Sequence, residues 1–540
     1  MVMTGNFTKK VLLTLTIIVA SLTASYAQKP QLIINIVVGS MRSNDLVRYE
    51  DNFQQQGFKR LMTGGVTYTN AYYDYALTST AAGLATFATG AQPSVHGAIG
   101  EQWWSYIDSS SVSLIEDKKV QPVPFSTGTG SYSPYRLNCP TLSDMVVASN
   151  SQSKSFTVAL DPLSAIILSG QSGTPYWVEN NKTHWTTSSA YSKDIPAWVK
   201  EYNSKNCNAQ YTLKRWTPLH LASLYHNSEV AVIEDIKNKS TNLLSNINLN
   251  NSKSAIGQMR YTPAGNTMLL KFASTLITKE KLGEDIAPDV LNICLDTSRY
   301  IASTYGPESM EYEDMLYRLD KDLGEFLTFV YSLVDNPLKV AVVVTSDHGT
   351  SPSYNPIGGR ERERFNVRQM EVIVNAFLGA RYGSDSYVLG FANNALYLNH
   401  QLLNNKQLSI DTIREEIATF MLQLRGISSA ISASSLRNTS FAEGRSRLMQ
   451  QSYFATRSGD VIIDFMPGWI IEDNSIRSSS DAGYNYDRRV PLIIYGILKS
   501  GTFGRDVNMT EVAPTLTTLL GIDQPWASTA SPLSECITIK

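Results

Sequence analysis

The sequence predicts an α/β protein built on a mostly parallel central sheet, and three observations support this prediction. Short continuous apolar runs bounded by turn residues recur along the chain, which is typical of strands buried on both faces. A segment with helical periodicity lies between two of these runs. The composition, 43% apolar and 17% charged over 540 residues, suits a large folded core and excludes disordered, collagen-like and coiled-coil chains.

The first segment of the chain, residues 1–27, is expected to be an export signal. Lys9 and Lys10 precede an apolar run over residues 11–22, and Ala27 ends a small-residue cleavage motif. The run is shorter than the roughly 20 residues needed to span a bilayer, so an uncleaved anchor is disfavoured and no transmembrane segment is predicted. We therefore expect a mature chain from Gln28 that is periplasmic or secreted.

The next elements are five expected strands and one helix. The strands are the apolar runs at residues 32–38, 155–160, 290–295, 340–344 and 490–495. The helix lies between the third and fourth runs, where apolar residues recur at helical spacing with charges on the opposite face: Leu316, Leu319, Leu323, Phe326, Leu327 and Val330. This strand, helix and strand order is the unit of a parallel sheet covered by helices.

Two stretches rich in Ser, Asn, Thr and Tyr interrupt the alternation, at about residues 171–280 and 354–458. We interpret them as insertions in one parent domain over residues 28–540, because the strand at 490–495 returns to the parent pattern after both. No Pro/Gly-rich linker begins either stretch. An inserted cap that folds independently stays open as an alternative.

Candidate chemistry is expected beyond the carboxyl ends of the strands, where open α/β sheets bind ligands. Asp347 and His348 follow the fourth strand directly. A carboxylate and an imidazole on adjacent residues can bind a divalent metal from two directions. The plainer alternative is that Asp347 caps the next helix while His348 faces solvent.

Charge and cysteine content restrict the partners only slightly. Forty-six basic and 48 acidic residues give a formal net charge of −2, so the overall balance does not indicate a nucleic acid or an anionic membrane as partner. Four cysteines allow three disulfide pairings, and spacing does not choose between them: Cys139, Cys207, Cys294 and Cys536. Cys294 lies inside an apolar run and is expected to be a small buried hydrophobic residue.

Several ordered blocks resemble the alkaline phosphatase superfamily, most closely its phosphate-irrepressible bacterial alkaline phosphatases and type I phosphodiesterase/nucleotide pyrophosphatases. The blocks are residues 77–83, 89–97, 346–349, 483–487 and 512–516. The resemblance implies an alkaline-phosphatase-like sandwich, with the sheet between helix layers and inserted cap segments. It also implies that Thr80, at the start of a helix, occupies the position of the nucleophile, where free N–H groups and the helix dipole favour a phosphoryl oxyanion.

The resemblance further implies two zinc ions held by six protein ligands besides the threonine. Asp347 and His348 match two of these positions. The other four hold residues that do not match the family's ligands: Gly39, Arg299, Ser303 and Ser480. A full two-zinc site is therefore disfavoured, although nearby carboxylates leave a shifted arrangement open: Asp45, Asp296 and Asp481. We expect either no metal or a single weakly bound divalent ion.

The Arg299 substitution suggests a hypothesis of its own. A permanent cation stands where a metal-binding carboxylate is expected, and its guanidinium could pair with Asp347 in place of the metal's charge. A structure with Arg299 far from Asp347 would contradict this pairing.

The expected phosphate clamp has changed as well. A lysine, an arginine and an asparagine that would hold phosphoryl oxygens are replaced by Asp161, Leu163 and Glu101. Two carboxylates at these positions repel a phosphate dianion, so we expect weak affinity for phosphomonoesters.

These departures lead to two functional hypotheses. The first is a catalytically impaired family member whose fold serves binding of a small molecule or a protein, or assembly. The second is a working hydrolase of phosphate or sulfate esters with Thr80 as nucleophile and one metal.

Overall fold

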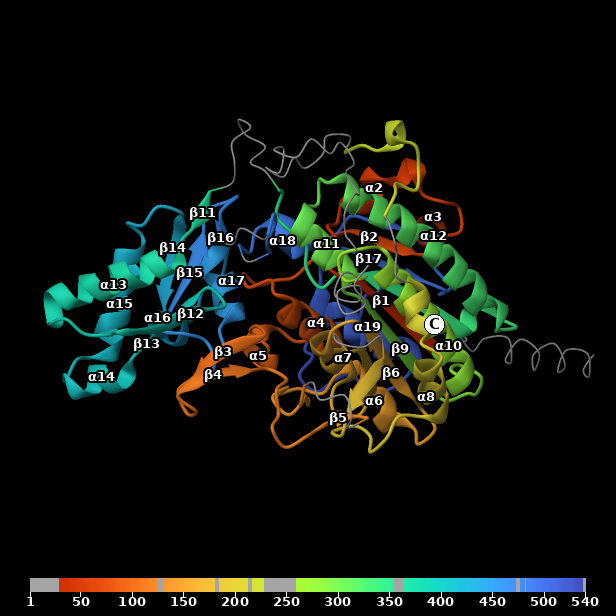
Figure 1. Ribbon diagram of the computed structural model, residues 1–540, viewed down its shortest axis with the longest axis horizontal. Coiled ribbons are helices and arrows are strands. Elements are labelled where there is room, and N and C mark those ends of the chain that lie inside the picture. Colours follow the sequence, from red (N-terminus) through yellow and green to blue (C-terminus); the bar gives the residue numbers. More distant parts are fainter. Residues whose placement is uncertain are drawn as a thin grey trace, which may run out of the picture.

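The computed structural model describes residues 29–124, 130–179, 184–211, 216–227, 259–353, 363–472, 476–480 and 482–537 (Figure 1). The expected export signal and Asp481 lie outside these ranges. None of the described helices has the length and apolar character required to cross a membrane.

The main body is built on a central sheet in which eleven strands take part. In spatial order the strands are β18 (Gly501–Phe503), β2 (Val66–Tyr72), β17 (Arg489–Tyr495), β10 (Val340–Thr345), β1 (Leu32–Val38), β9 (Asp289–Leu295), β6 (Ser155–Ala159), β7 (Thr174–Val178), β8 (Trp185–Ser188) and β5 (Pro122–Val123), with β19 (Val507–Asn508) paired to β2. The five strands from β10 to β7 run parallel to one another. The predicted mostly parallel α/β sheet is thus confirmed, and all five predicted strands belong to it. Two strands run in the opposite direction: β17 is antiparallel to both β10 and β2, and β8 is antiparallel to both β7 and β5.

Helices cover both faces of this sheet because the strand residues alternate between two cores. On β1, Ile34 and Ile36 belong to one hydrophobic cluster, whereas Ile33 and Val37 belong to another. The first cluster lies under α10 (Ala264–Glu280) and α12 (Met310–Ser332). The second lies under α4 (Thr80–Thr89), α6 (Leu142–Ser149), α7 (Pro162–Ser169) and α19 (Val512–Leu520).

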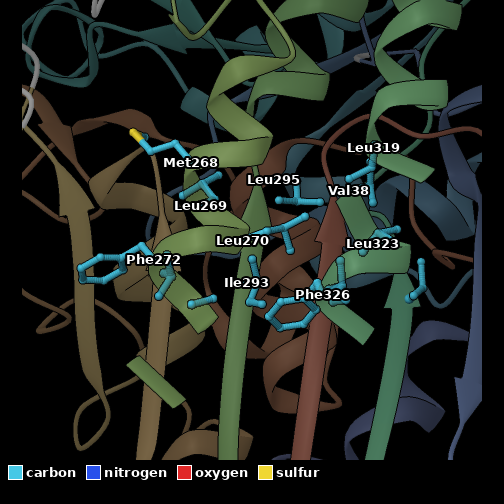
Figure 2. Close-up of a cluster of buried hydrophobic side chains, with 14 of the residues drawn as sticks. Val38, Met268, Leu269, Leu270, Phe272, Ile293, Leu295, Leu319, Leu323 and Phe326 are labelled. Carbon is cyan, nitrogen blue, oxygen red and sulfur yellow. The ribbon is translucent and has the colours of Figure 1, made fainter. Parts of the chain in front are cut away.

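The helix predicted from the spacing of its apolar residues is α12, and all six of those residues are buried. Figure 2 shows Leu319, Leu323 and Phe326 of α12 with Leu270 of α10 above the strand residue Ile293. Each fully buried side chain of this kind stabilises the fold by about 2 kcal/mol. The two helices therefore hold this face of the sheet together.

A second body, which we call the cap lobe, comprises residues 363–472 and lies at the left of Figure 1. Its antiparallel sheet contains β12 (Val388–Ala392), β13 (Ala395–Leu398), β15 (Val461–Phe465) and β14 (Ile427–Ser432). A separate hydrophobic cluster packs this sheet against α13 (Val367–Tyr382) and α15 (Ile410–Met421). The other predicted insertion differs, because β7, β8 and α10 from residues 171–280 are parts of the main body.

The remaining elements are short. They are α2 (Asp45–Arg48), α3 (Phe58–Gly64), α5 (Pro93–His96), β3 (Gln102–Ser105), β4 (Ser110–Ser113), α8 (Ala197–Ser204), α11 (Thr297–Tyr305), β11 (Arg364–Phe365), α14 (His400–Asn405), α16 (Ala433–Asn438), α17 (Gly444–Ser452), β16 (Ile470–Ile471) and α18 (Asn485–Arg488). All four cysteines are free thiols, and Cys294 is buried as predicted.

Candidate functional site

The candidate site lies at the carboxyl ends of β1, β9 and β10, next to the start of α4. A cavity of about 450 Å³ opens there. Most of the residues that line it carry a polar group: Ser40, Ser79, Thr80, Glu101, Gln102, Arg299, Ser303, His348, Thr350, Ala392, Asn393, Ile476, Ser478, Ser479 and Ser480. Ala392 and Asn393 come from the turn between β12 and β13, so the cap lobe forms one wall.

Thr80 is the first residue of α4, and the helix is fixed at that point by a cap and by close packing. The Ser79 hydroxyl accepts the N–H of Ala82 at 3.3 Å, a standard N-terminal cap. One turn later, a Cβ on Gly83 would lie 1.7 Å from the carbonyl oxygen of Asp347. Only glycine therefore allows α4 to lie so close to the end of β10.

The hydroxyl of Thr80 contacts His348 in a defined orientation. His348 Nδ1 lies 2.6 Å from the carbonyl oxygen of Gly349, so this nitrogen carries the proton in the neutral ring and donates it. His348 Nε2, 3.2 Å from Thr80 Oγ1, is then the acceptor. The Thr80 hydroxyl accordingly donates to the imidazole, with its lone pairs left for another donor.

That donor is Arg299, which lies in the first turn of α11. Its Nη1 donates to Thr80 Oγ1 at 2.9 Å, and its Nη2 donates to Asp161 at 2.8 Å. Two more carboxylates lie near the guanidinium, Asp296 at 3.5 Å and Glu101 at 3.7 Å. A permanent cation thus contacts the oxygen at the nucleophile position directly.

The predicted pairing of Arg299 with Asp347 is wrong, because Asp347 is not among the carboxylates within 4 Å of the guanidinium. Asp347 Oδ1 instead accepts the N–H groups of Ser40 and His348 at 2.8 and 3.0 Å. Ser40 adopts a left-handed backbone, with φ of 58°, at this position. Backbone donors at the ends of β1 and β10 thus saturate one oxygen of Asp347, and Arg299 is oriented toward the end of β6.

Asp161, expected from the sequence to replace a clamp cation, is buried and bound by three donors. Arg260 contacts Oδ1 at 2.7 Å, while Arg299 and the Tyr300 hydroxyl contact Oδ2 at 2.8 and 2.7 Å. At a position where the sequence predicts a replaced clamp cation, the structure thus shows a carboxylate within an internal ion-pair network. Burial, together with the nearby charge of Asp161, raises the pKa of Asp296 to about 6.

The remaining sequence-predicted positions lie in different surroundings. Ser303 and Ser480 both line the cavity, and the Glu101 side chain is 59% exposed at its edge. Leu163 is buried in the hydrophobic cluster below α7. At Gly39, a Cβ would lie 2.9 Å from the Cβ of Arg299, so the end of β1 and the start of α11 pack too closely for a side chain there.

The two neighbouring carboxylates that the structure describes, Asp45 and Asp296, are engaged by other partners. Asp45 accepts bonds from Arg42 and Tyr312, and Asp296 accepts from Ser164 and the backbone at the start of α7. Among the described residues, no three histidine, cysteine, aspartate or glutamate side chains are grouped closely enough to hold a metal ion.

Among the site residues that the sequence did not single out are Arg260, Tyr300 and Asn393. Arg260 lies far from Asp161 in the chain and carries no local signal. Asn393 and Asn394 both adopt left-handed backbones, with φ of 51° and 54°, at the tip of the β12–β13 hairpin. An Asn-Asn pair between two apolar runs is a signal for such a turn and could have been recognised.

Comparisons with known proteins agree with this architecture. A family model described as type I phosphodiesterase/nucleotide pyrophosphatase matches residues 33–485. Alkaline phosphatase PafA of Elizabethkingia meningoseptica is 29% identical over 94% of this chain and 95% of its own length. A protein named calcium-transporting ATPase from Myroides odoratus is 27% identical over 96% of each chain. The crystal structure of wild-type PafA superposes with a TM-score of 0.87 and 27% identity, covering 95% of this chain and all of that one.

Proposed function

This chain belongs to the type I phosphodiesterase/nucleotide pyrophosphatase family, within the alkaline phosphatase superfamily, and we propose that it is a degenerate member of that family. In this proposal it is exported through residues 1–27 to the periplasm or beyond. Its preserved fold binds a small-molecule or protein ligand, or serves assembly, and turnover through a two-zinc centre is lost.

The contact between Arg299 and Thr80 is the observation that supports this proposal most directly. A nucleophilic oxygen attacks most readily when a base or metal draws off its proton and its lone pair points at the substrate. Here one lone pair of Thr80 Oγ1 is engaged by the guanidinium at 2.9 Å. The Arg299 guanidinium also lies where the second zinc ion would have to bind. Repulsion between the two positive charges strongly disfavours that binding.

The side chains present do not fit a two-zinc site. Arg299, Ser303 and Ser480 stand at three of its ligand positions, and Gly39 at a fourth. Neither a glycine nor an arginine can donate a lone pair to zinc, and neutral serine hydroxyls are weak ligands beside imidazole and carboxylate. We therefore derive no catalytic step through a metal pair.

A second function, hydrolysis of phosphate or sulfate esters with one metal, has one observation in its favour. His348 Nε2 lies 3.4 Å from Asp347 Oδ2 and 3.2 Å from Thr80 Oγ1. Ligands of a tetrahedral zinc bound at about 2.0 Å lie about 3.3 Å apart, and both of these distances from His348 Nε2 are close to that value. Such an ion would polarise an ester oxygen, while Thr80 would remain the group nearest the substrate.

Metal analysis and assays together separate the two functions. We expect purified protein equilibrated with zinc and then desalted to retain much less than one ion per chain by mass spectrometry. We also expect no hydrolysis of aryl phosphates, diesters or sulfates above the level of the Thr80→Ala variant.

The opposite results would decide against the proposal. About two zinc ions per chain would contradict the degenerate assignment. One ion per chain with turnover that Thr80→Ala abolishes would establish the single-metal hydrolase. Thr78→Ala is the matched control, since this buried threonine lies two residues before Thr80 and bonds the carbonyl of Ser480.

A further inference from the structure

The surroundings of Asp161 resemble a receptor with its ligand in place. Its side chain is 10% exposed and lies at the end of β6, where it is the N-terminal cap residue of α7 without making a capping bond. Its two oxygens are instead occupied by donors from other parts of the chain. Residues distant in sequence therefore bind this carboxylate as they would bind a separate ligand.

The donors come from two separate segments. Arg260 precedes α10 and contacts one oxygen at 2.7 Å. Arg299 and Tyr300, neighbours on α11, contact the other at 2.8 and 2.7 Å. Two guanidinium groups and a phenol around one carboxylate form the charge-assisted pattern with which proteins recognise carboxylates, phosphates and sulfates.

The donors are also supported independently of Asp161. The guanidinium carbons of Arg260 and Arg299 lie 5.5 and 5.1 Å from the centre of the Tyr300 ring, within range of a cation–π interaction. Arg299 has further partners in Asp296 and Thr80. These contacts keep the donors in position when the carboxylate is removed.

We infer that Arg260, Arg299 and Tyr300 form a binding site for a small oxyanion, and that the chain supplies its own ligand in Asp161. The site differs from the clamp expected from the family, whose cations would stand at positions 161 and 163 themselves. With Asp161 in place the site is closed to external anions. Without its carboxylate it takes a planar carboxylate or a tetrahedral oxyanion of matching size.

Rescue of an Asp161→Ala variant by added anions tests this inference. The variant leaves two partly buried guanidinium groups without this carboxylate partner, so its melting temperature should fall below that of the wild type. We expect 100 mM formate to raise the melting temperature of Asp161→Ala by about 2 °C relative to chloride at equal ionic strength. Phosphate and sulfate are separate arms that show whether the site also takes tetrahedral anions.

Controls separate a specific site from a general salt effect. Asp161→Asn fills the same space without charge, so formate should not raise its melting temperature. The melting temperature of the wild type should not rise either. In the double variant Asp161→Ala/Arg260→Ala, the stabilisation by formate should be lost. If Asp161→Ala folds poorly, the test is its yield of folded protein, which should be higher in formate than in chloride.

Rescue confined to Asp161→Ala supports the site, with the effective anions defining its ligand class. Equal stabilisation of Asp161→Asn or of the double variant by the anions would overturn the inference. It would also be overturned if no anion stabilised Asp161→Ala. The readout does not involve turnover, so a chain that proves to be a working hydrolase would leave this result intact.

Discussion

At two neighbouring positions of the site, the sign of the side-chain charge is opposite to the one that the family resemblance implies. Arg299 places a cation where the family resemblance implies a metal-binding carboxylate, and Asp161 places a carboxylate where it implies a cation. The structure brings the two together at 2.8 Å. Either substitution alone would lack this ion pair, leaving Asp161 with Arg260 only, or Arg299 with the more distant Asp296 and Glu101.

Glu311 provides a test at the same scale, away from the site. This residue is 6% exposed in the first turn of α12, and its Oε2 has no hydrogen-bond partner among the described residues. Burial raises its pKa to about 7, above the 4.5 of an exposed glutamate. Between these values the folded state binds more protons than the unfolded state, so the free energy of unfolding falls as pH rises from about 4.5 to 7.

We therefore expect Glu311→Gln to be more stable than the wild type at pH 8 and nearly equal to it at pH 4.5. The gain should be about 2 to 3 kcal/mol, measured by urea unfolding at both pH values. Glu325→Gln is the control, because Glu325 is exposed beside Lys271. A gain that does not change with pH would show that Glu311 is charged in the folded protein.

Among the secondary-structure elements, the position of α4 depends on a close approach of its backbone to the end of β10. Its Gly83 packs directly against the carbonyl of Asp347, so a methyl group there must displace either the helix or the end of β10. Gly379, in the last turn of α13, has only ordinary contacts at 3.5 Å or more. The same substitution should thus have opposite effects in the two helices.

We expect Gly83→Ala to destabilise the protein by about 3 kcal/mol or more through overpacking. Gly379→Ala should stabilise it by about 0.5 to 1 kcal/mol, since alanine favours a helix interior. Chemical denaturation of both variants measures the difference. Equal effects of the two changes would mean that α4 can shift away from β10 without cost.

Much of the element pattern is predictable from the sequence, because buried parallel strands require continuous apolar runs. The run at residues 32–38 coincides with β1, and the other four predicted strands agree within a residue at each end. The reversed direction of β17 is not predictable, since an apolar run reads the same both ways. β2 went unrecognised because polar residues interrupt it. At the site, Thr80, Asp347 and His348 follow from motifs, but Arg260 reaches Asp161 only through the folded chain.

The whole molecule is a main body and a cap lobe joined next to the site. Arg457 of the cap lobe donates to the carbonyl oxygens of Gly97 and Arg136 at 2.6 and 2.8 Å, and to the side chain of Asn138 at 3.0 Å. Its guanidinium also lies 4.7 Å from the centre of the Trp103 ring. One partly buried side chain thus links the lobe to several places on the body.

We expect Arg457→Ala to weaken this junction by about 2 kcal/mol, since it removes three charge-assisted hydrogen bonds. Hydrogen exchange should accelerate in residues 97–104 and 136–138, whereas β13 and β15 inside the cap lobe should keep their protection. Arg425→Ala is the control, because Arg425 is exposed and pairs within the lobe with Glu363. Uniform acceleration throughout the cap lobe would instead show that the junction supports the lobe's own fold.

The close packing of Gly39 against Arg299 limits how a two-zinc site could be built into this protein. A Cβ at position 39 would lie 2.9 Å from the Cβ of Arg299, an atom that every residue except glycine carries. Placing an aspartate at position 39 therefore demands that the end of β1 or the start of α11 move, unless glycine replaces Arg299. Substitutions at the expected ligand positions should be strongly non-additive, with single changes harmful and benefit appearing only in combinations that also shift the backbone. A directed-evolution route to such a site would have to begin with the backbone.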